Sequence, residues 1–220
     1  MDFAIYDMDR TVTRHATYTP FLLHCALRRA PWRLLLLPLV IASMLTYVLK
    51  LIDRGRLKEI NHRLLLGHRR HPKELKPLVD SFAERTVASN VRPGARQAIE
   101  RDKAEGRRVV MATASYRLYA EAIAARLGFD DVIGTGSIIG LDERVHAKID
   151  GENCYGPAKL RMVADWHAKS GFERGHVRFY SDHASDAPVF DWADEPVAVN
   201  PHARLARLAI SRGWAVEDWG

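Results

Sequence analysis

The chain has 220 residues, of which 47% are hydrophobic and 27% charged, and these values exclude a disordered or fibrous protein. Its two cysteines, Cys25 and Cys154, are too few for a disulfide framework. The net charge of +6 is uneven, because residues 14–76 carry +10 and the remainder carries −4. We therefore expect an anionic partner for residues 14–76, whether phosphate, a membrane surface or nucleic acid.

The first predicted element is a buried strand over residues 3–6 that runs directly into two carboxylates, Asp7 and Asp9. In an open α/β sheet, ligands bind at the carboxyl end of a central strand. Side chains alternate along a strand, so we expect the chain to turn after Asp7 and bring both carboxyls to one site. Two acids in one site repel each other, which predicts a divalent cation between them. Because the strand begins so early, no secretory leader is expected, and we expect a cytoplasmic protein.

Residues 20–66 predict helices, with breaks at Pro31, Pro38 and Gly55. Residues 34–49 are the most apolar run, but sixteen uncharged residues fall short of the roughly 20 that span a bilayer. One interpretation is a buried helical hairpin. The other is peripheral contact of residues 28–58 with an anionic membrane, because Arg and Lys residues flank the run. A third interpretation is that a second copy of the chain packs against this apolar run, which would make the protein a homodimer.

The rest of the chain alternates between strands and helices. After a basic loop at residues 67–72 and a short helix at 78–88, we predict helices at 95–105, 117–127, 159–169 and 202–212, strands at 108–112, 132–134, 177–180 and 197–199, and a β-hairpin at 137–151. This order predicts an α/β protein with a Rossmann-like three-layer core and a parallel sheet. The core would comprise residues 1–13 and 90–220, and residues 14–89 would form an inserted helical cap domain.

Polar residues follow three of the predicted strands. They are Asp7 and Asp9, then Thr113, then Asp182 and Asp186. Lys159 opens a helix between the last two groups, and the carboxyl ends of parallel strands lie side by side, so these residues are expected to converge. Such a set suits phosphoryl transfer through an aspartyl-phosphate. Asp7 would be the nucleophile, and Asp9 would protonate the leaving oxygen and then activate water.

The remaining residues receive supporting roles. Mg²⁺ would be held by the carboxylates of Asp7 and Asp182 and by the backbone carbonyl of Asp9. Thr113 and Lys159 would bind the phosphoryl oxygens. Asp186 would orient Lys159 or hold a metal-bound water. Further candidates, by their position beside these groups, are Thr11, Ala114, Ser115 and His183.

These residues carry a resemblance to a known family. Asp7-Met8-Asp9-Arg10-Thr11, Thr113, Lys159 and Asp182-x-x-x-Asp186 look like the four motifs of the haloacid dehalogenase superfamily, in the order and spacing of its phosphatase branch. The insert resembles the C1-type helical cap of subfamily IB, which is phosphoserine-phosphatase-like. In composition as much as in motif, the insert is also similar to the cap of the bacterial phosphatidylglycerophosphate phosphatase of the third type. The phosphoserine enzymes carry a cap glutamate nine residues after the nucleophile, where this chain has Ala16.

The resemblance implies a Mg²⁺-dependent phosphomonoester hydrolase. Its first candidate substrate is a lipid phosphate such as phosphatidylglycerophosphate, at the inner membrane surface. The alternative is a small soluble metabolite, phosphoserine-like or histidinol phosphate. Transfer of the phosphoryl group to another hydroxyl, and a non-catalytic protein that binds a membrane surface, also stay open. No nucleic-acid partner is expected, because no recognisable binding module is present.

Overall fold

A computed structural model describes all 220 residues and confirms an α/β protein built on one mixed sheet. The sheet order is β2-β5-β4-β3-β1-β6-β7-β8. The strands from β4 to β8 in this order run parallel, whereas β5 and β2 are antiparallel at one edge. Their bounds are β1 Phe3–Tyr6, β2 Arg69–Arg70, β3 Arg108–Tyr116, β4 Asp131–Ile139, β5 Val145–Asp150, β6 Val177–Ser181, β7 Glu195–Val199 and β8 Ala215–Glu217.

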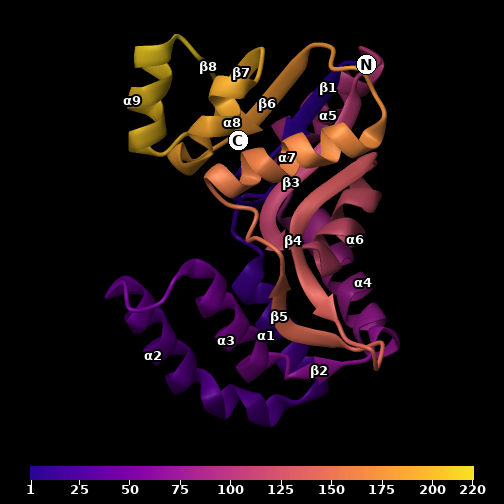
Figure 1. Cartoon of the computed structure of the whole chain (residues 1–220), viewed down its shortest axis with the longest axis vertical. Helices are drawn as coiled ribbons and strands as arrows, with labels where there is room; N and C mark the ends of the chain where they lie inside the picture. The colour runs from indigo at the N-terminus through magenta and orange to yellow at the C-terminus, as the bar shows by residue number, and fades with distance from the viewer.

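Helices cover both faces of the sheet, which gives the three layers that the sequence predicts (Figure 1). Strand β1 is central because its four residues are all apolar and all buried. Its Phe3 and Ile5 pack towards α7 (Pro157–Ser170), α8 (Ala187–Trp192) and α9 (Ala203–Arg212). On the other face Ala4 and Tyr6 pack towards α5 (Pro93–Ala104), and α6 (Arg117–Leu127) continues that layer.

The segment between β1 and α5 forms the lower part of the molecule in Figure 1. It contains α1 (Tyr18–Arg29), a 3-10 helix (Pro31–Leu36), α2 (Leu37–Val48), α3 (Arg54–Leu65), the short strand β2, and α4 (Pro72–Ser89). Helices α1 to α3 pack together, whereas α4 runs back beside α6 of the layered core. The assignment of residues 14–89 to a separate cap domain stays a prediction.

Several predicted elements differ from the observed ones. The predicted basic loop contains β2, whose Arg69 and Arg70 pair with β5. The helix predicted at 78–88 instead begins at Pro72, a residue suited to a helix start, and the side chain of His71 accepts a hydrogen bond from the Lys73 N–H. It also includes Pro77, although the predicted helix begins only at Leu78. Helix α8 and strand β8 were missed because both are very short.

Of the interpretations left open for residues 34–49, the buried helical hairpin is wrong for α2. Only Val40 and Ser43 of this helix are buried, and the Ser43 hydroxyl donates a 2.8 Å hydrogen bond to Asn61 Oδ1 of α3. Leu35, just before α2, is 80% exposed. Residues Pro31–Val48, with a mean hydropathy of 1.6, are long and apolar enough to cross a membrane, yet only 11% of them are buried. The most apolar run of the chain is therefore also among its most exposed.

Candidate active site

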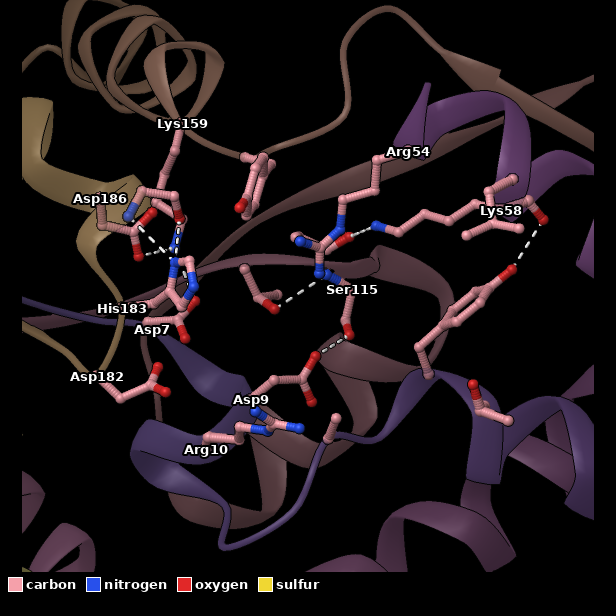
Figure 2. A pocket seen from close by; sticks show the side chains of 18 of the residues that line it. Asp7, Asp9, Arg10, Arg54, Lys58, Ser115, Lys159, Asp182, His183 and Asp186 are labelled. Carbon is pink, nitrogen blue, oxygen red and sulfur yellow. Dashed lines mark hydrogen bonds and ion pairs between the residues drawn. The ribbon is translucent and has the colours of Figure 1, made fainter. Parts of the chain in front are cut away.

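The chain turns sharply after β1, as the sequence predicts, and the turn directs Asp7 and Asp9 into one pocket. The Asp7 N–H donates a 2.9 Å hydrogen bond to the Tyr180 carbonyl at the end of β6. A wide turn over Met8–Val12 follows, in which Arg10 has a φ of 68°, uncommon for a residue with a side chain. Both carboxyls line a cavity of about 420 Å³ at the carboxyl edge of the sheet (Figure 2).

Lys159 lies between two carboxylates at the base of this pocket. Gly156, with a φ of 59°, makes the turn that starts α7 and places Lys159 in its first turn. The ammonium Nζ donates 2.7 Å hydrogen bonds to Asp7 Oδ1 and to Asp186 Oδ2, and the Ser181 hydroxyl donates to the same Asp186 oxygen at 2.7 Å. Burial alone would lower the pKa of Lys159, but Asp186 and Asp7 outweigh it and raise this pKa, which keeps the lysine charged.

Asp182, at the end of β6, is tied to the first turn through Thr11. Its backbone N–H donates a 2.9 Å hydrogen bond to Thr11 Oγ1. The same hydroxyl lies 3.2 Å from Asp182 Oδ1 and 3.4 Å from Asp7 Oδ2, so the two carboxylates flank it. Burial raises the pKa of Asp7; Lys159 opposes that shift, and the charges of Asp186 and Asp182 add to it. Burial also raises the pKa of Asp182.

The carboxylates of Asp7 and Asp182 fit a hard divalent cation. Both are buried and destabilised in their charged form, so a cation between them would relieve that cost. No group of three or more His, Cys, Asp or Glu side chains is placed to hold a metal ion. Mg²⁺ matches this sparse set, because it is usually held by one or two carboxylates and completes its shell with water and substrate phosphate.

The Asp9 carboxyl is held by three donors beside the pocket. Its Oδ1 accepts 2.7 Å hydrogen bonds from the backbone N–H and the hydroxyl of Thr17. Its Oδ2 accepts from the hydroxyl of Ser115 at 2.6 Å (Figure 2). Since Thr17 precedes α1 and Ser115 lies in β3, Asp9 connects the inserted segment to the sheet. These contacts fix the position of the Asp9 carboxyl in the pocket, and therefore the point from which it would deliver a proton.

The other predicted residues also lie at the pocket. Thr113 is buried, and its hydroxyl accepts a 3.0 Å hydrogen bond from the Ser115 N–H. His183 is exposed, its Nδ1 lies 2.8 Å from the Ser185 hydroxyl, and partial desolvation lowers its pKa. Thr113, Ala114, Ser115 and His183 all line the cavity, whereas Thr11 lies beneath it. The structure thus gathers every residue that we singled out, and their chemical roles stay predictions.

Sequence reasoning missed the cations and aromatic residues that complete the pocket wall. They are Arg10, Tyr18, Tyr47, Arg54, Lys58, Tyr155 and His202. The Arg54 guanidinium lies 4.2 Å from the centre of the Tyr155 ring. Lys58 is buried, donates a 2.7 Å hydrogen bond to Asn153 Oδ1 and a second to the Ala114 carbonyl, and burial, with help from Arg54, lowers its pKa to about 7.

Two signals in the sequence could have identified some of these residues. Arg54 and Lys58 are four residues apart, so they lie on the same side of a predicted helix. His202 follows the last core strand, at the same edge as the other candidates, and its Nε2 lies 3.2 Å from Asp182 Oδ2. The aromatic residues carried no comparable signal, because aromatic side chains are usually core residues.

Comparison with known proteins gives one family match. The family described as haloacid dehalogenase-like hydrolase matches residues 4–191, and the chain therefore belongs to that family. A phosphoserine phosphatase of Mycobacterium tuberculosis is 30% identical over 146 residues, which cover 66% of this chain and 47% of that protein. A histidinol-phosphatase of Neisseria meningitidis is 26% identical over 65% of this chain and 66% of its own length. The chain spans about half the length of the first curated relatives that it matches.

Solved structures agree on the fold. A Bordetella pertussis protein of unknown function superposes with a TM-score of 0.89 at 24% identity, over 100% of this chain and 99% of that one. A substrate-bound phosphoserine phosphatase superposes with a TM-score of 0.63 at 15% identity, over 93% of this chain and 89% of that one. These similarities support the layered fold with its helical insert, and at such low identity they carry no substrate with them.

Proposed function

Because this chain belongs to the haloacid dehalogenase-like hydrolases, we propose that it is a phosphatase that hydrolyses phosphomonoesters through a phosphorylated Asp7. The observation that carries the proposal is the position of Lys159, which holds Asp7 and Asp186 together at 2.7 Å each inside the pocket that Asp9 and Asp182 also line. A buried lysine paired in this way orients one carboxylate and leaves a cation beside it for phosphate.

In the first step an Asp7 oxygen attacks phosphorus, the bond from phosphorus to the leaving oxygen breaks, and Asp9 gives its proton to that oxygen. Lys159 and Thr113 bind the phosphoryl oxygens during the transfer. In the second step water attacks phosphorus, Asp9 takes its proton, and the bond to Asp7 breaks, which releases phosphate. The hydrogen bonds from Thr17 and Ser115 hold Asp9 in place for both steps.

The cofactor of this proposal is Mg²⁺, held by the carboxylates of Asp7 and Asp182 and by the backbone carbonyl of Asp9. When bound, the ion offsets the repulsion between a carboxylate nucleophile and a phosphate dianion. The raised pKa values of Asp7 and Asp182 support this assignment, because a site that destabilises two carboxylate charges favours a counter-ion.

The relatives favour the alternative substrate, a small soluble phosphomonoester, over the lipid phosphate that the sequence put first, because they are named phosphoserine phosphatase and histidinol-phosphatase. Ala16 lines the pocket, and away from the cluster of four aspartates the wall carries Arg10, Arg54 and Lys58 instead of a carboxylate. Such a wall suits a leaving group that bears a carboxylate or a second phosphate better than one that bears only an amine.

A lipid phosphate is the second candidate, favoured by one observation. Tyr47 of the exposed helix α2 also lines the active-site cavity, so this apolar helix reaches the pocket mouth. A phosphomonoester at the end of an acyl-bearing headgroup could enter the pocket from that side, with its chains left outside.

A phosphate-release assay tests the proposal on an aryl phosphate, phosphorylated amino acids, sugar phosphates, a bisphosphate and a short-chain lipid phosphate. We expect Mg²⁺-dependent release that is lost in Asp7→Asn, with preference for leaving groups that bear a carboxylate or a second phosphate. The variant Asp165→Asn, altered on the exposed side of α7, is the matched control and should keep full activity. Release that persists in Asp7→Asn would reject the assigned nucleophile, and no release from any compound would reject the phosphatase.

A further inference from the structure

The exposed side of α2 is an unusual surface for a helix in water. Ile41, Leu45, Val48 and Leu49 follow one another at helical spacing and are each between 58% and 71% exposed. We name these four residues the α2 apolar face. Leu35 and Leu51 extend it at its two ends, at 80% and 70% exposure. Contiguous exposed apolar side chains of this kind mark a surface that binds something.

The opposite side of α2 is fixed to the rest of the insert. Val40 and Ser43 face inward, and the Ser43 hydroxyl bonds to Asn61 of α3. The Arg33 guanidinium just before α2 donates to the Leu64 carbonyl at 2.7 Å and to the Arg63 carbonyl at 3.1 Å. In Figure 1, α2 lies at the outer edge of the insert, beside α3. The twelve residues of α2 alone would extend only about 18 Å, against the roughly 30 Å of a bilayer core. A span would therefore need the preceding 3-10 helix as well, and the Arg33 contacts hold that helix against the insert.

The charges around this face select its partner. The chain has no acidic residue between Arg14 and Ile52. Arg28 and Lys50, which flank the 3-10 helix and α2, form no ion pair with an acidic side chain. Trp32 and Tyr47, 59% and 38% exposed, lie towards the two ends of the run, where amphipathic rings suit a headgroup region. An apolar face bordered by free cations and aromatic rings is complementary to anionic lipid.

A second copy of the chain fits this face less well. A two-fold dimer puts the same patch of both copies together. Arg28 and Lys50 of one copy would then approach the same cations of the other, with no acidic residue of residues 15–52 to separate them. The repulsion would oppose a dimer centred on α2, whereas anionic lipid headgroups would neutralise these cations.

We propose that the α2 apolar face docks the protein on an anionic lipid bilayer, with α2 lying in the interface instead of crossing the membrane. Because Tyr47 lines the active-site cavity and a second cavity formed by residues 47–48 and 50–53, the pocket mouth would then lie at the headgroup level. This inference concerns binding and does not depend on the proposed hydrolysis. Docking is expected to be the same in Asp7→Asn.

Vesicle pelleting tests the inference. We expect the full chain to pellet with vesicles of phosphatidylcholine and phosphatidylglycerol at low salt, less at high salt, and little with phosphatidylcholine alone. The double variant Ile41→Ser/Leu45→Ser should lower the vesicle partition constant about tenfold or more, because two inserted apolar side chains are lost. The matched control is Ile210→Ser, which removes an 82% exposed apolar residue from α9 and should bind like the wild type.

Three outcomes would overturn the inference. They are no pelleting with anionic vesicles at low salt, equal loss of pelleting in Ile210→Ser, and a wild-type dimer in analytical ultracentrifugation that Ile41→Ser/Leu45→Ser converts to monomer. Thermal unfolding of each variant confirms that its fold is intact, and the exposure of these side chains makes a folding defect in them unexpected.

Discussion

The pocket base and the α2 apolar face both depart from the ordinary distribution of side chains, in opposite directions. At the pocket base, Asp7, Lys159 and Asp186 are charged and buried, and each has a partner at 2.7 Å. On α2, apolar side chains are mostly exposed to solvent. Buried charges and exposed apolar patches are the informative exceptions in a folded protein. The difference teaches that the charges at the pocket base are largely paired within the chain, whereas the apolar side chains of α2 face solvent, where a partner from outside could cover them.

Of the variants considered, Lys159→Met should have the largest effect, because it removes the cation that pairs the buried carboxylates at the pocket base. The change leaves Asp7 and Asp186 facing each other without the ammonium, which should cost about 3–5 kcal/mol of unfolding free energy. Phosphate release should fall at least about a thousandfold, because a phosphate ligand and the orientation of the nucleophile are lost together. Urea unfolding and the phosphate-release assay measure the two quantities. A stable variant with near-normal turnover would refute both roles of Lys159.

A variant of a buried charged residue outside the pocket distinguishes an effect on stability from an effect on catalysis. Asp102 is fully buried and accepts hydrogen bonds from the Tyr6 hydroxyl and the Arg178 guanidinium. Asp102→Ala should cost about 3–4 kcal/mol of unfolding free energy, since it leaves two donors without this partner. The kcat of the folded fraction should stay within about twofold, because Asp102 lies outside the pocket lining. A lost kcat in fully folded protein would show that the chemistry reaches beyond the pocket.

His62 predicts how the insert responds to pH. Both ring nitrogens are buried without a partner, and burial lowers the pKa of His62 from 6.5 to about 4. Between those values His62 is protonated in the unfolded chain but neutral in the folded one, so its contribution to stability falls as pH drops, by at most roughly 3 kcal/mol. His62→Phe should flatten this dependence, as measured by urea unfolding between pH 4 and pH 7. The exposed-site control His15→Gln should keep it, and an unchanged slope in His62→Phe would contradict the assignment.

The smallest effect on stability is expected for changes in the α2 apolar face, in contrast to changes at the pocket base. Ile41→Ser/Leu45→Ser should change the unfolding free energy by no more than about 0.5 kcal/mol, because these side chains are already in water. Thermal or urea unfolding of the lipid-free protein checks this. A large destabilisation would mean that the face packs within the chain in solution, and the contrast with the pocket base would disappear.

The sheet and the pocket base could be predicted from local pattern. The apolar segments that lead to Asp7, Thr113 and Asp182 predict neighbouring parallel strands, and the carboxyl ends of parallel strands must share one edge. Strand β3 itself runs past Thr113 to Tyr116. The pocket wall could not be predicted in the same way. Arg54 and Lys58 reach the pocket only because α3 packs against strand β5 and the loop at Asn153. No local sequence pattern encodes this long-range packing.

The insert also shows that local pattern does not determine how an element packs. Its helices were predicted, because helical periodicity is local, but the sequence left open whether α2 is buried or exposed. An apolar helix in a sequence fits a buried position and a docking surface equally well. Only the placement of Val40 and Ser43 against α3, with Ile41 and Leu45 turned outward, distinguishes them.

The central claim is that Asp7 carries the phosphoryl group, and trapping that group tests it most directly. The enzyme would be quenched with acid during turnover of an aryl phosphate, treated with borohydride, and digested for mass spectrometry. An acyl-phosphate on Asp7 is reduced to homoserine, so the account predicts homoserine at position 7 in the wild type and none without substrate. Turnover that leaves position 7 unmodified, or a modification at another carboxylate, would contradict it.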